Sequence, residues 1–244
     1  MSDRFYSPTP ITTERVTLDG PEAHHLLHVM RAAVGTEITL FDGSGAEFPA
    51  VVEVLRRSEA VVRVVERRAI DRELPFELVV GVALPKGDRQ KWLVEKLTEL
   101  GVTMLVPLVT ERGVAQPTAS AAERLARSVI EAAKQCGRNR LMQIAEPQPW
   151  NDWITMRWLG SSASEPPAAP RRLIAHPNGA RLSEINVREP APTHIAIGPE
   201  GGLTDAEVGA AVAAGWQQVS LGRSILRVET AAIALAAAVA LCRD

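Results

Sequence analysis

The sequence predicts a parallel α/β sheet preceded by a small β-barrel. Strand and helix patterns alternate from residue 76 onward, short strand patterns dominate the first seventy residues, and the polar segment 66–73 separates the two regions. Alternating strands and helices are typical of a parallel sheet, and closely spaced short strands are typical of a small barrel. We therefore expect two domains, a barrel over residues 1–72 and an α/β domain over residues 74–244.

The first region contains three predicted strands and one predicted helix. The strands cover residues 37–41, 47–55 and 60–65, with turn-forming residues between them. The helix is predicted from Pro21 to Ala33, because proline suits the first turn of a helix and Gly35 follows the expected end.

The second region opens with the apolar run 76–84, which is typical of a strand covered on both faces. Further strands are predicted over residues 102–109, 172–175, 194–197 and 218–221. Helices are predicted from the N-cap Asp88 to Gly101, from Ser120 to Gly137, from Thr204 to Ala214, and from Glu229 to Cys242. Glu123 and Glu207 complete capping boxes with Ser120 and Thr204. Pro166 and Pro167 predict a surface loop.

Composition excludes several classes of protein. Of the 244 residues, 46% are hydrophobic and 23% are charged, which is ordinary for a globular protein and excludes overall disorder. No apolar run is long enough to span a membrane, and the N-terminal residues MSDRFYSP do not form a signal peptide. Two cysteines provide no disulfide framework, and the histidines at positions 24, 25 and 28 lie far in sequence from any cysteine, so we expect no metal site. These features favour a soluble, cytoplasmic protein.

The distribution of charge is more informative than its sum. A net charge of −2 argues against a nucleic-acid partner, but residues 86–140 carry 10 basic and 6 acidic side chains. A basic stretch within an acidic chain can form a contact surface for phosphate. Arginine, which suits recognition of phosphates and bases, accounts for 23 of the 27 basic residues, although a GC-rich genome produces the same bias.

Three predicted strand ends carry unusual loops. Parallel sheets bind ligands beyond the carboxyl ends of their strands, and the segments here are 175–179 (AHPNG), 197–202 (IGPEGG) and 221–231 (LGRSILRVETA). Their glycines allow the backbone to approach a ligand closely. Neither the Rossmann nor the P-loop glycine fingerprint is present.

The sequence GPEGG followed by LGxxILRxETA resembles the SPOUT class of RNA methyltransferases. More narrowly, the whole chain resembles the ribosomal small subunit methyltransferase E family. The matching segments, in the family's order, are 4–5, 24–26, 29–31, 41–47, 84–89, 95–101 and 135–140. The family usually has arginine where this chain has Ser224, and Arg223 lies one position earlier.

This resemblance implies S-adenosylmethionine-dependent methylation of N3 of a uridine in the 16S ribosomal RNA of the 30S subunit. It also implies a homodimer, a PUA-like N-terminal barrel, and a deep trefoil knot in the C-terminal segment. Two alternatives remain open. One is a SPOUT methyltransferase acting on another ribosomal or transfer RNA nucleotide. The other is a non-catalytic RNA-binding or ribosome-assembly factor, against which the intact glycine loops and the ILRxET sequence argue.

Two residues are candidates for catalysis. Given the resemblance, we expect Arg227 to stabilise the anionic uracil or to contact a phosphate. We expect Glu229 to orient Arg227 or to order its loop. An Arg227–Glu229 salt bridge, or a Glu229 carboxylate that complements the dipole of the last helix, is the structural alternative. That helix is apolar almost all round, so we expect it to be buried against the sheet or a dimer partner.

The predicted cofactor-binding residues lie in the three glycine-containing loops, and structural turns or plain core packing are their alternatives. They are His176, which could also act as a base, Pro177, Ile197, Gly198, Pro199, Glu200, Gly201, Gly202, Leu221, Gly222, Ile225, Leu226, Thr230 and Ala231. The predicted RNA-binding residues are basic or follow a helix end, where we expect them to be exposed, and solvated surface positions are their alternative. They are Arg4, Arg31, Lys86, Arg89, Arg138, Asn139 and Arg140.

Overall fold

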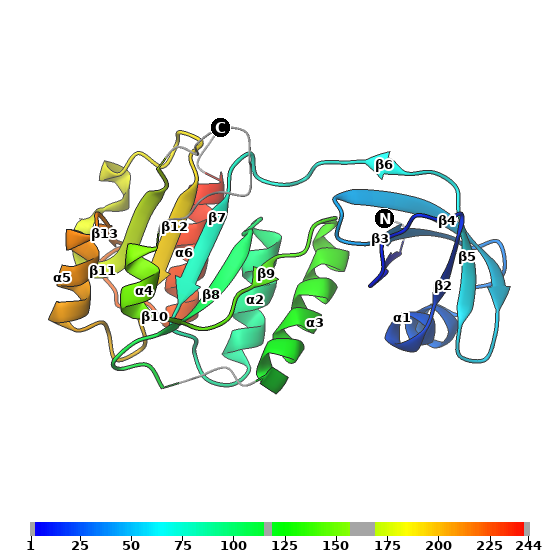
Figure 1. Cartoon of the computed structure of the whole chain (residues 1–244), viewed down its shortest axis with the longest axis horizontal. Coiled ribbons are helices and arrows are strands. Elements are labelled where there is room, and N and C mark those ends of the chain that lie inside the picture. Colours follow the sequence, from blue (N-terminus) through cyan, green and yellow to red (C-terminus); the bar gives the residue numbers. More distant parts are fainter. Residues whose placement is uncertain (1–2, 115–118, 157–168, 242–244) are drawn as a thin grey trace. The chain divides into compact units, whose positions relative to one another are not determined.

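The computed structural model describes residues 3–114, 119–156 and 169–241 (Figure 1). The chain divides into two compact units. The N-terminal unit comprises Met1–Glu73 and Ile130–Leu141, and the C-terminal unit comprises Leu74–Val129 and Met142–Asp244. The loop predicted at Pro166 and Pro167, the side chain of Ser120 in its capping box, and the helix end at Cys242 lie outside the described residues.

The N-terminal unit is built on a six-stranded sheet with the order β1-β3-β4-β5-β2, and β6 pairs with β4. Its strands are β1 (Arg4–Tyr6), β2 (Arg15–Leu18), β3 (Glu37–Phe41), β4 (Ala46–Leu55), β5 (Ala60–Val64) and β6 (Arg68–Ala69). Strands β1 and β3 are parallel, and the other pairs are antiparallel. The three predicted strands are confirmed within one residue at each end, whereas β1, β2 and β6 were not predicted.

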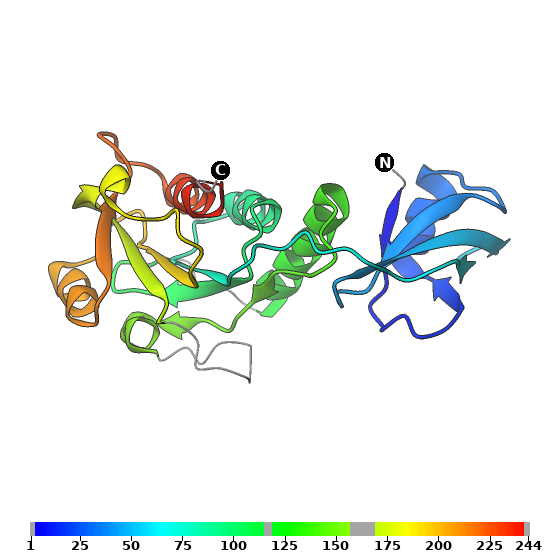
Figure 2. The ribbon, with the colours of Figure 1, turned by 90° about the horizontal axis from the view of Figure 1, so that it is seen from above.

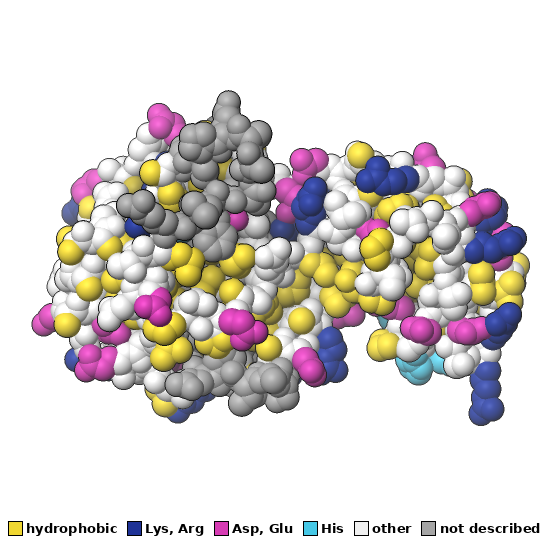
Figure 3. Space-filling view, viewed as in Figure 1, with side chains coloured by type: hydrophobic (Ala, Val, Ile, Leu, Met, Phe, Trp, Pro, Cys, Tyr) yellow, Lys and Arg dark blue, Asp and Glu magenta, His cyan; other side chains and the backbone are white. Residues whose placement is uncertain are grey.

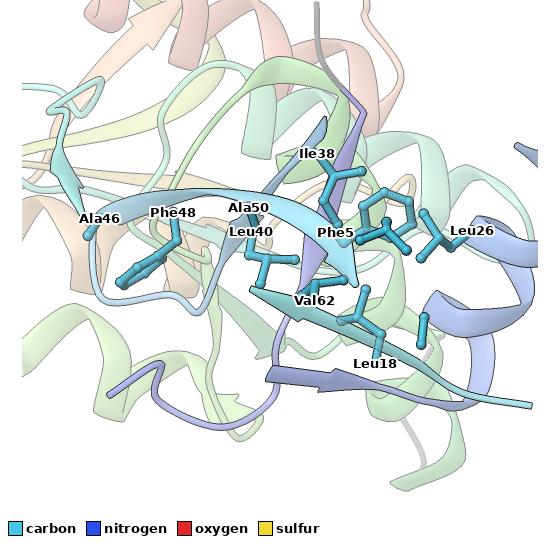
Figure 4. Packing of buried hydrophobic residues seen from close by; sticks show 11 residues of the cluster. Phe5, Leu18, Leu26, Ile38, Leu40, Ala46, Phe48, Ala50 and Val62 are labelled. Carbon is cyan, nitrogen blue, oxygen red and sulfur yellow. The ribbon is translucent and has the colours of Figure 1, made fainter. Parts of the chain in front are cut away.

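The concave side of this sheet holds the core of the unit (Figure 4). Phe5, Leu26 and Leu40 are fully buried, and Val62 of β5 packs in the same cluster. Burial of a side chain of this size contributes about 2 kcal/mol to folding. Phe5, close to the N-terminus, therefore ties the short strand β1 to the rest of the unit.

The helical segment of the N-terminal unit is shorter than predicted. Helix α1 (Gly20–His24) continues directly into the π-helical turn η1 (His25–Val29). The prediction that the helix runs to Ala33 is wrong, because Arg31 takes a left-handed conformation with φ 53°. A non-glycine residue with positive φ does not continue a right-handed helix.

The C-terminal unit contains a parallel seven-stranded sheet with the order β10-β8-β7-β12-β11-β13, and β9 pairs with β8. Its strands are β7 (Leu78–Val82), β8 (Met104–Val109), β9 (Gln143–Ile144), β10 (Gln148–Pro149), β11 (Arg171–Arg181), β12 (Thr193–Ile197) and β13 (Gln217–Ser220). The predicted parallel sheet and its five main strands are confirmed. Strand β11 extends well beyond its predicted end at Ala175.

Helices cover both faces of this sheet (Figure 2). Helices α2 (Arg89–Glu99) and α6 (Val228–Leu241) pack together on one face, and α4 (Trp150–Thr155) and α5 (Asp205–Ala213) lie on the other. Helix α3 (Ala119–Cys136) and the short 3₁₀ turn η2 (Leu182–Glu184) complete the chain. In the part of the chain that is described, no helix combines the length and apolar character needed to cross a bilayer.

Two helix starts test the capping predictions. Thr204 accepts a hydrogen bond from the backbone N–H of Glu207, and the Glu207 carboxylate accepts one from the backbone of Thr204, so this capping box is confirmed. Asp88 stands at the N-cap of α2 but its side chain makes no capping bond, because its backbone is already helical (φ −65°, ψ −17°). The predicted capping role of Asp88 is therefore wrong.

Candidate active site

The loops with unusual sequences follow neighbouring strands of the C-terminal sheet. Strands β7, β12, β11 and β13 are consecutive neighbours and parallel, so their carboxyl ends lie at the same edge of the sheet. The segments 198–202 and 221–227 are at these ends of β12 and β13, and residues 83–88 follow β7, whereas residues 176–179 lie within β11, before its end at Arg181.

The loop after β12 depends on glycine at two positions. A Cβ atom on Gly198 would lie 2.7 Å from Cγ of Leu203, so a side chain there would displace Leu203. Gly202 has φ +72°, and a Cβ on it would meet nothing within 4 Å. The loop thus turns sharply and leaves open space beside the exposed backbone of Gly202. Ile197 and Pro199 are buried beneath it.

Residues after β8 brace this loop, and no motif in the sequence pointed to them. The backbone N–H of Glu111 donates to Oε1 of Glu207 at 2.9 Å, and Nη1 of Arg112 donates to the carbonyl of Gly201 at 3.1 Å. Glu207 also closes the capping box of α5. One buried carboxylate therefore joins the end of β8 to the start of α5.

Strand β11 contains an excursion of four residues. Ala175 and Ala180 both pair with Val219 of β13, so residues 176–179 leave the ladder between them. The backbone N–H of Asn178 donates to Nδ1 of His176 at 3.3 Å and stabilises the excursion. A Cβ on Gly179 would lie 2.5 Å from the backbone nitrogen of Val219, so only glycine fits where the chain rejoins β13.

The loop after β13 exposes its predicted functional residues. Gly222 has φ +125°, and Ile225 is 91% exposed although it is apolar. The carbonyl of Arg227 accepts the backbone N–H of Ala231 at 2.8 Å, so Arg227 stands at the start of α6 with an exposed side chain. Among the residues that the structure describes, Arg227 forms no ion pair.

Arg89 connects the start of α2 with two of the other loops. Its Nη2 lies 3.0 Å from Oε1 of Glu200, and its Nη1 lies 3.6 Å from Oε2 of Glu229. The Glu229 side chain is only 6% exposed, so the Arg89 guanidinium compensates a buried carboxylate. The expected contact of Glu229 with Arg227 is thus replaced by one with Arg89. Arg89 brings the loops after β7, β12 and β13 together.

Three predicted RNA-binding residues are engaged inside the N-terminal unit. Arg138 and Asn139 are 4% and 2% exposed, so the expectation that they are exposed is wrong. Nε of Arg138 donates to Glu73 at 3.2 Å, and Arg4 donates to the side chain of Asn139. Nη1 of Arg4 also donates to Glu47 at 3.0 Å.

The carboxylate of Glu47 pairs with both Arg4 and Arg72. Burial alone raises the pKa of Glu47, but hydrogen bonds from Arg72 and Arg4 outweigh burial and hold its pKa below the ordinary value. The remaining predicted RNA contacts, Arg31, Lys86 and Arg140, are exposed. Figure 3 shows basic side chains interspersed with acidic ones on the N-terminal unit rather than gathered into one patch on the visible face.

Comparison with known proteins identifies the family. The model of a family described as RNA methyltransferase domain matches residues 72–240, and that of a family described as RNA methyltransferase PUA domain matches residues 18–65. The chain is 35% identical over 225 residues to a ribosomal RNA small subunit methyltransferase E from Synechocystis sp., which covers 92% of this chain and 72% of the relative. The chain belongs to the ribosomal RNA small subunit methyltransferase E family.

Solved structures agree with this assignment to the methyltransferase E family. A ribosomal RNA small subunit methyltransferase E from Neisseria gonorrhoeae, bound to S-adenosylmethionine, is 30% identical with a TM-score of 0.86, covering 100% of this chain and 98% of that one. A Legionella pneumophila methyltransferase in complex with the same cofactor is 28% identical with a TM-score of 0.87, covering 98% and 97%. The predicted fold class, a SPOUT-type α/β domain with a PUA-like N-terminal domain, is confirmed, and its barrel is a half-barrel sheet. The trefoil knot stays a prediction.

The sheet edge of this family member has features that fit S-adenosylmethionine. The cofactor carries hydroxyls, an adenine ring and a cationic sulfonium. Open space lies beside the exposed backbones of Gly202 and Gly222, and apolar side chains of Leu226 and Ile225 stand nearby in sequence. Glu200 contributes a partly exposed carboxylate to the same edge.

Proposed function

We propose that this chain transfers a methyl group from S-adenosylmethionine to N3 of a specific uridine in 16S ribosomal RNA. The observation that carries this proposal is the contact of Arg89 with both Glu200 and Glu229, which gathers three loops of the sheet edge into one site. The family assignment and the cofactor-bound relatives support the same reaction. The proposed substrate implies a cytoplasmic location.

In this proposal the cofactor is held by the loops after β12 and β13, by the start of α6, and by the excursion of β11. The backbone of residues 198–202 contacts its polar groups, with Glu200 accepting from ribose hydroxyls. Leu221, Ile225 and Leu226 cover the adenine, and the backbone of Gly222 approaches it closely. The remaining contacts come from His176, Pro177, Thr230 and Ala231. When bound, S-adenosylmethionine supplies an electrophilic methyl group, and the loops align it with the attacking nitrogen.

Arg227 and Glu229 act on the uracil side of the site. N3 of uracil carries an imide proton that must leave before or during attack, and the resulting anionic base is stabilised by a nearby cation. The guanidinium of Arg227 is available for this role, because it is exposed and forms no ion pair with any described residue. Glu229 acts indirectly, since its carboxylate holds Arg89 rather than Arg227.

Exposed basic residues of both units bind the RNA in this proposal. Arg31 and Arg140 of the N-terminal unit and Lys86 of the C-terminal unit are exposed, and they contact phosphates in this proposal. Arg4, Arg138 and Asn139 support the surface from below through their buried contacts. Arg89 contributes through the loops it joins. The partner is the 16S RNA of the 30S subunit.

A homodimer completes the proposal. One stripe of α6 is apolar but only partly covered, and it consists of Ile233, Ala234, Ala237, Ala238 and Leu241. Trp92 on the neighbouring helix α2 is 43% exposed. A second copy of the chain would cover this apolar face, and sedimentation analysis of a Trp92→Glu variant tests it: a variant that remains as dimeric as the unchanged chain would reject this face.

Two measurements test the proposed reaction. Calorimetry should show binding of S-adenosylmethionine, and its absence would leave a non-catalytic RNA-binding protein. Mass mapping of 16S RNA from a strain that lacks the modification, complemented with this chain, should show N3-methyluridine restored. A methyl group appearing at another nucleotide would reassign the target.

A further inference from the structure

A cavity in the N-terminal unit lies outside the loops that are proposed to hold the cofactor. Its volume is about 200 Å³. Its walls come from the turn before β4, from the segment around β6, and from the residues that follow α3. All of these residues belong to the N-terminal unit.

The lining of the cavity combines two cations, two carboxylates and an apolar surface, and one of the carboxylates, Glu73, is paired with Arg138. Arg67 and Arg140 are exposed, and neither forms an ion pair within the described residues. The exposed carboxylate of Asp71 lines the same cavity and uses Oδ1 to accept the backbone N–H of Glu73 at 3.0 Å. Ala69 and Ile70 contribute apolar surface. This combination suits a nucleotide, which has a phosphate, a polar base edge and an apolar ring face.

The hydrogen bonds of the buried residue Asn139 fix the shape of the cavity. The side chain of Asn139 donates through Nδ2 to the backbone carbonyl of Ile70 at 3.3 Å. The backbone carbonyl of Asn139 accepts the backbone N–H of Gly45 at 3.2 Å. Arg4 holds the Asn139 side chain from the other side. Three walls are thus joined through one buried asparagine, so the cavity is formed before any ligand binds.

We propose that this cavity binds one unpaired nucleotide of the RNA substrate whose base carries an exocyclic amino group. Arg67 and Arg140 contact the flanking phosphates, and the free oxygen of Asp71 accepts a hydrogen bond from the amino group. Carboxylates recognise the N4 amino group of cytosine in this way, and uracil has no such donor. The proposal rests on the proposed function and adds a second point of RNA recognition.

The charge of Asp71 makes the test decisive. If the cavity is only a phosphate-binding surface, Asp71→Asn removes a repulsive charge and should tighten RNA binding. If Asp71 accepts from a base, Asp71→Asn should weaken binding of amino-bearing bases and leave uridine unaffected. Asparagine keeps the oxygen that accepts the Glu73 N–H, so the local backbone is preserved.

The experiment measures the affinity of the full chain for labelled single-stranded hexamers of cytidine, adenosine and uridine at low ionic strength. We expect the unchanged protein to bind the cytidine or adenosine hexamer about fivefold or more tightly than the uridine hexamer, and Asp71→Asn to abolish this preference. Arg67→Ala should weaken binding of all three hexamers severalfold. Arg57→Ala, at an exposed arginine of the β4–β5 turn with no ion pair among the described residues, is the matched control and should leave the base preference unchanged.

Equal affinity of the unchanged protein for the three hexamers would overturn the inference. Tighter binding of the cytidine and adenosine hexamers by the Asp71→Asn variant would overturn it too. Methyl transfer to 30S subunits by the unchanged protein is measured in parallel. Absence of methyl transfer by the unchanged protein would reject the proposed function. Normal methyl transfer without a base preference would reject only the nucleotide cavity.

Discussion

The buried carboxylate of Glu229 at the start of α6 lies 3.6 Å from the guanidinium of Arg89 at the start of α2. The same guanidinium lies 3.0 Å from Glu200, in the loop after β12. Arg89 therefore fixes two segments that are more than 100 residues away from it along the chain. This arrangement explains how separate strand ends are held as one site.

Arg89→Ala should destabilise the C-terminal unit and weaken cofactor binding. Loss of one partner leaves the other charge of a buried pair uncompensated, and because the Arg89 side chain is 36% exposed we expect a loss of about 1–2 kcal/mol. The free energy of unfolding in urea and calorimetry with S-adenosylmethionine measure the two effects. Lys91→Ala is the control, because Lys91 is 65% exposed and lies 3.7 Å from Glu95 on the helix surface. Equal effects of the two variants would contradict the bridging role.

Arg227→Ala should lower turnover by about 100-fold or more while leaving the fold and the cofactor affinity intact. The side chain is exposed, so its removal opens no cavity. Single-turnover methyl transfer measures the rate, and calorimetry measures the cofactor affinity. Arg188→Ala, at another exposed arginine of the same unit, should retain normal turnover. Near-normal turnover of Arg227→Ala would remove its catalytic role.

The main elements of the fold were predictable because they are long enough to show periodicity. The alternation of residues 37–41 and the apolar run from residue 76 both identified strands. Strands β1 and β6 have three and two residues, too few for alternation to be recognised. The end of η1 depends on the backbone conformation of Arg31, which tertiary packing determines.

The candidate site was predictable only in its glycine loops. Glycine clusters at strand ends are visible in the sequence, but the contacts of Arg89 and Glu207 join residues far apart along the chain. The exposure of Arg138 and Asn139 was wrongly predicted for the same reason. Their partners Glu73 and Arg4 are 65 and 135 residues away in sequence.

Gly179→Ala should destabilise the protein because its Cβ would meet the backbone of β13 rather than a flexible side chain. The distance to the nitrogen of Val219 would be 2.5 Å, so the strand itself must move, at a cost of about 1–3 kcal/mol. Urea unfolding measures this loss, and cofactor binding should weaken with it. Gly209→Ala is the control, because that exposed helical glycine has open space around it and alanine should stabilise α5 by about 0.5–1 kcal/mol. A neutral Gly179→Ala would show that the excursion in β11 tolerates a side chain.

His194 should make the C-terminal unit less stable in mild acid. Burial first, and the positive charge of Arg172 second, lower the pKa of His194 from 6.5 to about 4 in a site where its ring stacks on Trp153. Between pH 6.5 and pH 4, His194 is protonated in the unfolded chain but stays neutral in the folded chain. Stability present above pH 6.5 is therefore lost as the pH falls towards 4, by roughly 3 kcal/mol in total.

Urea unfolding followed by tryptophan fluorescence between pH 7.5 and pH 4.5 measures this loss for His194. All five tryptophans belong to the C-terminal unit, so the signal reports that unit alone. His194→Gln should flatten the dependence of unfolding free energy on pH, because glutamine does not titrate. His24→Gln, at an exposed histidine of the N-terminal unit, should leave the dependence unchanged. If His194→Gln kept the full slope, other groups would account for the acid sensitivity.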